Sequence, residues 1–306
     1  MLYEKSRKGA LTKEEFQNPG KEYRGAPFWA LNGKLTKEEA ARQIAVFDQM
    51  GFGGYNLHSR TGLQIPYLGE EFFDFIRYAV EEGKKRGMYS WLYDEDRYPS
   101  GAAGGLVTKD LAWRARCMLL TAKPQEGYCE SREAFEQAVR EGRKPRGYYV
   151  TSYEICLEDG YLKEYRRITR EAALSHMEAM EREGRPAAGR QIRMAYVRLS
   201  PESPWYNDCT YLDTLNPQAV DRFIQVTHEA YAREVGKEFG TWIPAIFTDE
   251  PQMAGKYALT FADSAEDATI AFTDDLDDTF RKTWGVSLLD ILPEILWELP
   301  GGAVSV

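Results

Sequence analysis

The chain has 306 residues, of which 43% are hydrophobic and 28% are charged, and its net charge at pH 7 is −9. This composition is typical of a globular protein, and the acidic balance argues against a nucleic-acid partner because phosphate binding needs a basic surface. No apolar run approaches the roughly 18 residues of a membrane span. The first residues include the acidic Glu4 where a signal peptide would have its apolar stretch, so we expect a cytoplasmic protein with no membrane partner.

Residues 24–97 alternate short apolar runs with amphipathic helices, a pattern that indicates βα units on a parallel sheet. Thr36 and Glu39 have the spacing of a capping box at the start of the first helix, and Gly51 ends that helix. We expect strands at 27–31, 53–59 and 88–94 and helices at 37–50 and 70–86, which together form three barrel units.

Residues 98–210 interrupt this pattern. They begin with a Gly-rich loop at 101–105, which lacks the Lys-Ser/Thr of a phosphate-binding loop and is a weak signal for a nucleotide. Alternating apolar and polar runs such as 148–157 follow, so we interpret the segment as an inserted, mostly β subdomain after the third strand. Its strands are expected at 116–121, 147–157 and 192–199, and its helices near 131–140 and 169–183.

The barrel pattern resumes in residues 211–300, where Asn216-Pro217 has the sequence of a helix start. A fourth strand is expected at 242–248 and further helices within 274–297. Four parallel strands are half of an eight-stranded barrel, and no fifth strand is visible before the end of the chain. We therefore expect an α/β fold of the (β/α)8 TIM-barrel type, truncated to its first four βα units, with exposed edges that favour self-association.

Polar residues follow all four expected strands. The active site of a βα barrel lies at the carboxyl ends of its strands, so these side chains are expected to converge there. They are Asn32 after the first strand, His58 and Arg60 at the second, Asp94, Asp96 and Arg97 after the third, and Asp249 and Glu250 after the fourth.

Carboxylates dominate this set, and cleavage of a glycosidic bond needs two of them. Glu250 is the candidate catalytic acid, and the alternative is that it caps the next helix. Asp94 and Asp96 alternate along an extended segment, so both point to one side and could bind sugar hydroxyls, hold a metal ion or supply the second carboxylate. Alternatively, Asp94 to Arg97 form a solvated charge cluster with an internal ion pair.

Aromatic residues make up 13% of the chain, which suits either sugar stacking or a large aromatic core. Trp91, Trp29 and Tyr93 are candidate stacking faces, with Trp91 the one assigned to the site, although a residue of this kind is more often part of the core than of a ligand shell. His58 ends an apolar strand, so a binding role and a structural role are equally compatible with its position.

Five motifs follow one another along the chain, namely PFWALNGKLTKEEAARQI, MGFGGYNLHSRTGL, YLGEEFFDFI, WLYDEDRYPSGAAGG and FTDEP. This ordered series resembles glycoside hydrolase family 106, the α-L-rhamnosidase-like proteins. The similarity extends from about Arg24 to Pro293.

This resemblance implies a (β/α)8 catalytic domain that hydrolyses α-L-rhamnosides with inversion, aided by Ca²⁺. It also implies that Glu250 in FTDEP is the catalytic acid and that the partner base lies on a later strand, which this chain does not contain. We therefore expect these residues to bind an oligosaccharide or glycoside weakly without hydrolysing it. The alternatives are a non-catalytic carbohydrate-binding remnant and a metal-dependent lyase or isomerase that uses Asp94 and Asp96.

Overall fold

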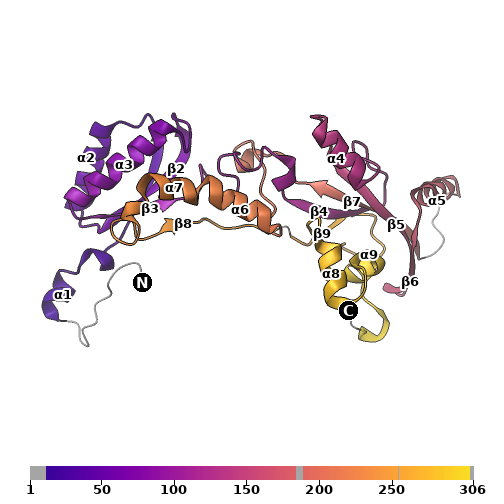
Figure 1. Ribbon diagram of the computed structural model, residues 1–306. Coiled ribbons are helices and arrows are strands. Elements are labelled where there is room, and N and C mark those ends of the chain that lie inside the picture. The colour runs from indigo at the N-terminus through magenta and orange to yellow at the C-terminus, as the bar shows by residue number, and fades with distance from the viewer. Residues whose placement is uncertain (1–11, 184–188, 254, 304–306) are drawn as a thin grey trace. The chain divides into compact units, whose positions relative to one another are not determined.

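The computed structural model describes residues 12–183, 189–253 and 255–303 (Figure 1). The chain divides into two compact units, each with its own sheet. The first unit contains the chain up to Asp110 together with Glu202–Leu212 and Pro217–Gln252, and the second contains Leu111–Pro201, Asp213–Asn216 and the chain from Met253 onward. Within the described ranges, no helix has the length and apolar character needed to cross a membrane.

The sheet of the first unit has four parallel strands in the order β1-β2-β3-β8, as expected. They are β1 (Phe28–Gly33), β2 (Gly54–Leu63), β3 (Tyr89–Tyr93) and β8 (Ile246–Phe247). β8 is shorter than the expected strand at 242–248, because Pro244 has no N–H to donate to a ladder. β2 runs past Ser59 and pairs Leu63 with Gly33 across a register shift in β1.

Helices of the first unit follow the expected βα order. They are α1 (Lys13–Gln17), α2 (Lys37–Gln49), α3 (Glu70–Lys85), α6 (Pro217–Val226) and α7 (His228–Val235), with short 3₁₀ turns η1 (Lys21–Tyr23), η3 (Pro204–Tyr206) and η4 (Gly236–Glu238). Thr36 caps α2 by accepting a hydrogen bond from the backbone of Glu39. The reciprocal half of the expected capping box is replaced, because the Glu39 carboxylate binds Arg42 and Gln43 instead.

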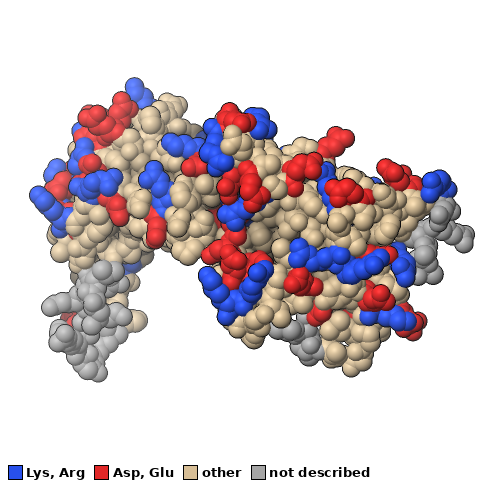
Figure 2. Space-filling model, turned by 45° about the vertical axis from the view of Figure 1, so that its right-hand side comes forward, with Lys and Arg blue, Asp and Glu red and all other residues tan. Residues whose placement is uncertain are grey.

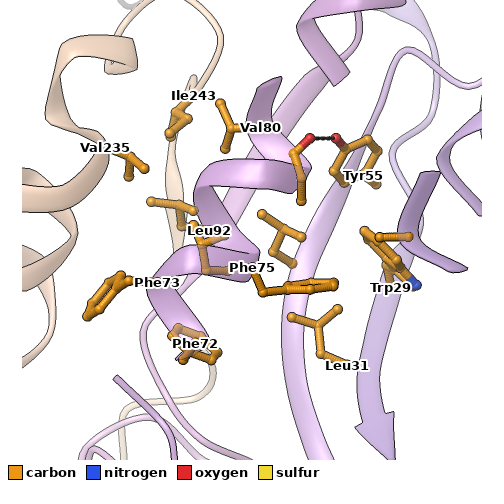
Figure 3. Close-up of a cluster of buried hydrophobic side chains, with 14 of the residues drawn as sticks. Trp29, Leu31, Tyr55, Phe72, Phe73, Phe75, Val80, Leu92, Val235 and Ile243 are labelled. Carbon is orange, nitrogen blue, oxygen red and sulfur yellow. Dashed lines mark hydrogen bonds between the residues drawn. The ribbon is translucent and has the colours of Figure 1, made fainter. Parts of the chain in front are cut away.

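Strand alternation decides which face of this sheet is packed. Trp29 and Leu31 of β1 are buried with Phe72 and Phe75 of α3 (Figure 3). Phe28 alternates with Trp29 along β1, so it lies on the opposite side of the sheet, and it is 60% exposed. The Tyr55 hydroxyl crosses this core to donate to the backbone oxygen of Ala79 at 2.6 Å. The helices therefore cover one side of the sheet, and the polar strand ends project beyond it.

The second unit has a five-stranded antiparallel sheet in the order β6-β5-β7-β4-β9. Its strands are β4 (Arg116–Thr121), β5 (Gly147–Glu158), β6 (Tyr161–Ile168), β7 (Arg190–Leu199) and β9 (Ala268–Phe272). Its helices are α4 (Arg132–Arg140), α5 (Arg170–Glu183), α8 (Leu276–Trp284) and α9 (Leu288–Ile291), with 3₁₀ turns η2 (Leu111–Trp113), η5 (Leu292–Ile295) and η6 (Pro300–Gly302). On the face shown in Figure 2, basic and acidic side chains are interspersed over both units.

The boundaries of the two units differ from the expected segments in two places. Residues 98–110 belong to the first unit, because the Glu95 carboxylate holds their loop. The chain after Gln252 belongs to the second unit, because β9 pairs with β4 and Leu292 and Trp297 enter the core of that sheet. The segment 211–300 is therefore divided between two cores.

Candidate active site

A row of aromatic rings crosses the parallel sheet at the level where β3 and β8 end. His58 in β2 stacks on Tyr93 in β3, with ring centroids 3.7 Å apart. The Phe28 ring lies 5.1 Å from both His58 and Phe247 in edge-to-face contacts. Because side chains alternate along a strand, these rings lie on the side of the sheet opposite to the buried Leu92.

His58 is a neutral member of this row. Its side chain is buried, and burial, together with the positive charge of Arg60, lowers the pKa of His58 to about 4. No described group lies in hydrogen-bonding geometry with its Nδ1 atom. His58 is therefore uncharged at neutral pH and is a poor proton donor for catalysis.

Asp94 follows β3 but continues the helix side of that strand and is fully buried. Its Oδ1 accepts a hydrogen bond from Ser100 at 2.6 Å, and its Oδ2 accepts one from Thr248 at 2.6 Å. Burial raises the pKa of Asp94, and these hydrogen bonds oppose that rise. Asp94 and His58 consequently do not converge, and Asp94 ties the end of β8 to the loop after β3.

His228 joins this network, although the sequence analysis gave it no role. Its Nε2 lies 3.4 Å from Oδ2 of Asp94, and its Nδ1 lies 2.9 Å from the hydroxyl of Thr227. The expected continuous helix is broken here into α6 and α7, and Thr227 donates to the backbone oxygen of Phe223 at 2.7 Å. Helical periodicity continues across the break, so no pattern in the sequence marked it.

Glu95 is buried inside the Gly-rich loop. Its Oε2 accepts backbone hydrogen bonds from Gly101, Ala102 and Ala103 at 2.7–2.9 Å, and its Oε1 accepts them from Asp96 and Gly104. The loop thus forms a nest of N–H groups for an anion, and the anion is supplied by the protein itself. The solvated-cluster interpretation is wrong for Asp94 and Glu95, because both carboxylates are buried.

Asp96 and Arg97 lie at the margin of the same loop. Asn207 donates to Oδ2 of Asp96 at 3.1 Å, and the Arg97 guanidinium lies 3.9 Å from that oxygen. Burial raises the pKa of Asp96. The backbone oxygen of Arg97 accepts hydrogen bonds from Tyr93 at 2.6 Å and from Arg60 at 3.4 Å, which brings Arg60 to this side of the site.

Glu250 is exposed and has a left-handed backbone, with φ of 37°. Such a conformation is strained for a residue with a side chain and is concentrated at functional sites. The Tyr98 hydroxyl donates a hydrogen bond to Oε2 of Glu250, and the backbone N–H of Asp249 donates to Ser100 at 2.9 Å. No described helix begins between Glu250 and Leu276, so the interpretation of Glu250 as a helix cap is wrong. Burial and the negative charge of Glu250 raise the pKa of Asp249.

The remaining candidate residues differ in exposure. Asn32 is exposed near the end of β1, and Trp91 is half-buried beside Tyr89, with ring centroids 5.9 Å apart. Trp29 is a core residue that donates to Gln43 at 2.6 Å, so it offers no stacking face. Tyr93 is likewise buried and already stacked on His58.

A small pocket lies beside the loop after β3. Its lining includes Arg97, Tyr98 and Pro99 together with Tyr206 and Asn207. The last two residues come from the segment 202–212, which returns to the first unit. Sequence reasoning missed Tyr98, Ser100 and this segment, because loops have no periodicity from which a spatial neighbour can be inferred.

The calcium ion implied by the resemblance stays a prediction, and the three acidic residues after β3 already have hydrogen-bonding partners. Calcium takes six to eight oxygen ligands. Both oxygens of Asp94 and of Glu95 already accept hydrogen bonds, and Asp96 is engaged by Asn207. Among the described residues, no three His, Cys, Asp or Glu side chains are grouped so that they could hold a metal ion.

No protein-family model matches this chain, and no curated protein matches it. Among solved structures, a rhamnosidase from Novosphingobium sp. PP1Y is similar, with 12% sequence identity and a TM-score of 0.47. The similarity covers 92% of this chain and 42% of that rhamnosidase, so the chain spans less than half the length of the protein it matches. At this level of similarity, we base the functional proposal on the site itself.

Proposed function

We propose that the first unit carries the active-site end of a glycoside hydrolase, with an α-L-rhamnoside as substrate and Glu250 as the catalytic acid. The observation that supports it most directly is the placement of Glu250. This carboxylate is exposed at the carboxyl end of a parallel strand, on a strained backbone, and Tyr98 fixes one of its oxygens. The ordered motifs of the sequence favour the rhamnosidase-like specificity.

Three features would let this arrangement perform acid catalysis. Tyr98 holds Oε2 of Glu250, which leaves Oε1 to approach the leaving oxygen of the glycosidic bond. Asp249 supplies a second carboxylate one residue away, and burial raises its pKa. Arg60 places positive charge near Asp249 and counteracts that rise. An inverting mechanism also requires a base, with a water between the two carboxyl groups.

Substrate contacts are assigned to the exposed and half-buried residues that the sequence predicted at the strand ends. We propose that the polar ones hold sugar hydroxyls and that Trp91 stacks on a sugar ring, whereas Asp94 positions the loops and His58 forms part of the aromatic row. Barrel closure by further strands is part of the proposal, because the order β1-β2-β3-β8 is that of consecutive strands in a (β/α)8 barrel. The proposed contact residues are Asn32, Arg60, Trp91, Asp96, Arg97 and Asp249.

The test compares the 306-residue chain with its Glu250→Gln variant, with p-nitrophenyl α-L-rhamnoside as substrate and p-nitrophenol release as the measurement. Any turnover should fall by a factor of about 10²–10⁴ in the variant, because general acid assistance is worth that much. Glu298→Gln in the second unit serves as the matched control and should leave the rate unchanged.

Binding measured by calorimetry with methyl α-L-rhamnoside separates the remaining possibilities. Binding without turnover by the unsubstituted chain would favour the carbohydrate-binding remnant and place the second carboxylate elsewhere. If the unsubstituted chain shows no binding and no turnover, the proposed carbohydrate site is contradicted altogether.

A further inference from the structure

An exposed tryptophan stands on a rigid turn of the first unit. Trp205 lies in η3 and is 62% exposed. Ser203 caps this turn by accepting a hydrogen bond from the backbone of Trp205 at 3.2 Å, and the backbone of Ser203 pairs with Cys209 at 2.9 Å. The turn is thus closed at both ends, so its shape does not depend on burial of the indole ring.

The same turn is fastened to both loops of the candidate site. Asn207 donates to Asp96 in the loop after β3 at 3.1 Å. Tyr206 donates to the side chain of Gln252, which follows Glu250 in the segment after β8, at 2.8 Å. Trp205 therefore has a fixed position relative to the proposed catalytic residues.

One side chain separates Trp205 from Glu250. The rings of Trp205 and Tyr98 meet edge to face, with centroids 5.8 Å apart and an interplanar angle of 77°. The hydroxyl of that same Tyr98 donates to Glu250. An edge-to-face contact engages at most one face of the indole, so its high exposure leaves a flat apolar surface open beside the candidate acid.

We propose that Trp205 is the stacking platform for a pyranose ring bound at or next to the glycosidic bond whose leaving oxygen Glu250 protonates. This inference rests on the proposed function and adds to it the subsite that recognises the sugar face. A pyranose presents C–H groups on its faces and hydroxyls at its rim. Stacking would cover the C–H face, while Asn207 on the same turn and Asp96 and Arg97 on the adjoining loop supply polar groups for the hydroxyls.

A 6-deoxyhexose suits such a platform well, because the methyl group at C5 enlarges the apolar area that can contact the indole. The ring needs little ordering on binding, since the turn is already fixed, and a pre-organised aromatic anchor loses little conformational entropy. Trp205 could not be identified from the sequence, because it lies within the expected inserted subdomain and away from the expected strand ends.

The experiment measures binding of methyl α-L-rhamnoside by calorimetry in the Glu250→Gln background, so that hydrolysis does not consume the ligand. Trp205→Ala should raise the Kd about tenfold, and Trp205→Phe should recover part of that loss because a smaller aromatic face remains. Trp284→Ala is the matched control, since Trp284 is 58% exposed and lies in α8 of the second unit.

Two results would overturn the proposal, and they can be told apart. Equal Kd values for the Trp205→Ala variant and its parent would remove Trp205 from the subsite while leaving the carbohydrate function intact. Absence of binding by the parent itself would overturn the carbohydrate function and the subsite together. Thermal unfolding of each variant serves as the control for folding, and the exposed substitutions should leave the melting temperature unchanged.

Discussion

At the residue scale, His58 links burial to a measurable pH dependence. The folded protein holds the pKa of His58 at about 4, whereas an unfolded histidine titrates near its ordinary value of 6.5. Between these pH values the unfolded state binds the additional proton, so the free energy of unfolding falls as pH drops from about 6.5 to 4. His58→Phe keeps a ring against Tyr93 and removes this titration.

We therefore expect the melting temperature of His58→Phe to fall less steeply than that of the unsubstituted protein over this pH range. His176→Gln in α5 is the control and should retain the full slope. Identical slopes for His58→Phe and the unsubstituted protein would mean that the pKa of His58 does not differ between the folded and the unfolded state. Scanning calorimetry at several pH values between 4 and 7 provides the measurement.

The active site of a βα barrel lies at the carboxyl ends of its strands, and this rule explains which candidate residues could be found from the sequence. It pointed to Glu250, Asp249 and Arg60 as candidates, because the carboxyl ends of parallel strands must share one edge of the sheet, and their role stays a prediction. It did not predict the burial of Asp94. β3 ends at Tyr93, and because side chains alternate, Asp94 turns to the side opposite Tyr93, where the helices pack. Trp205 was beyond its reach, because only tertiary contacts bring that turn to the site.

At the element scale, the elements with clear periodicity were predicted and those defined by pairing were missed. α2, α3 and the strands of the parallel sheet have the expected positions within a few residues. β6 was missed because its sequence is largely polar, although Asp159-Gly160 has the left-handed pair of a tight hairpin turn. β9 was missed because a five-residue apolar run acquires its identity only by pairing with β4.

The loop around Glu95 supports a prediction at this scale. Glu95→Gln replaces one of the two acceptor oxygens with an NH2 group, which cannot accept hydrogen bonds from the surrounding backbone N–H groups. Leaving buried donors unsatisfied costs about 1–3 kcal/mol, so the variant should lose stability of that order and residues 98–105 should exchange amide hydrogens faster. Glu71→Gln on the exposed side of α3 should change neither property. Unchanged protection of this loop in Glu95→Gln would show that the carboxylate does not organise it.

At the scale of the whole molecule, the parallel sheet and a mostly β second region were both expected, but the division of the chain between them was not. Sequence order suggested one insertion followed by a return to the barrel. Instead, the chain after Gln252 completes the second sheet through β9 and its helices. A sequence read in order cannot show this, because the partner strand of β9 lies about 150 residues earlier and long-range pairing has no local signature.

The edge of the parallel sheet determines the last prediction. β1 is an end strand in the order β1-β2-β3-β8, and Phe28 in it is 60% exposed. An end strand presents unpaired backbone groups, and an exposed apolar side chain adds to its tendency to pair with a second copy. We propose that the chain self-associates at this edge, and that Phe28→Lys weakens the association because two copies would bring like charges together. Phe16→Lys in α1, where Phe16 is 74% exposed, is the matched control and should associate like the unsubstituted chain. Sedimentation velocity over a range of concentrations measures the effect, and an unsubstituted chain that stays monomeric throughout would contradict it.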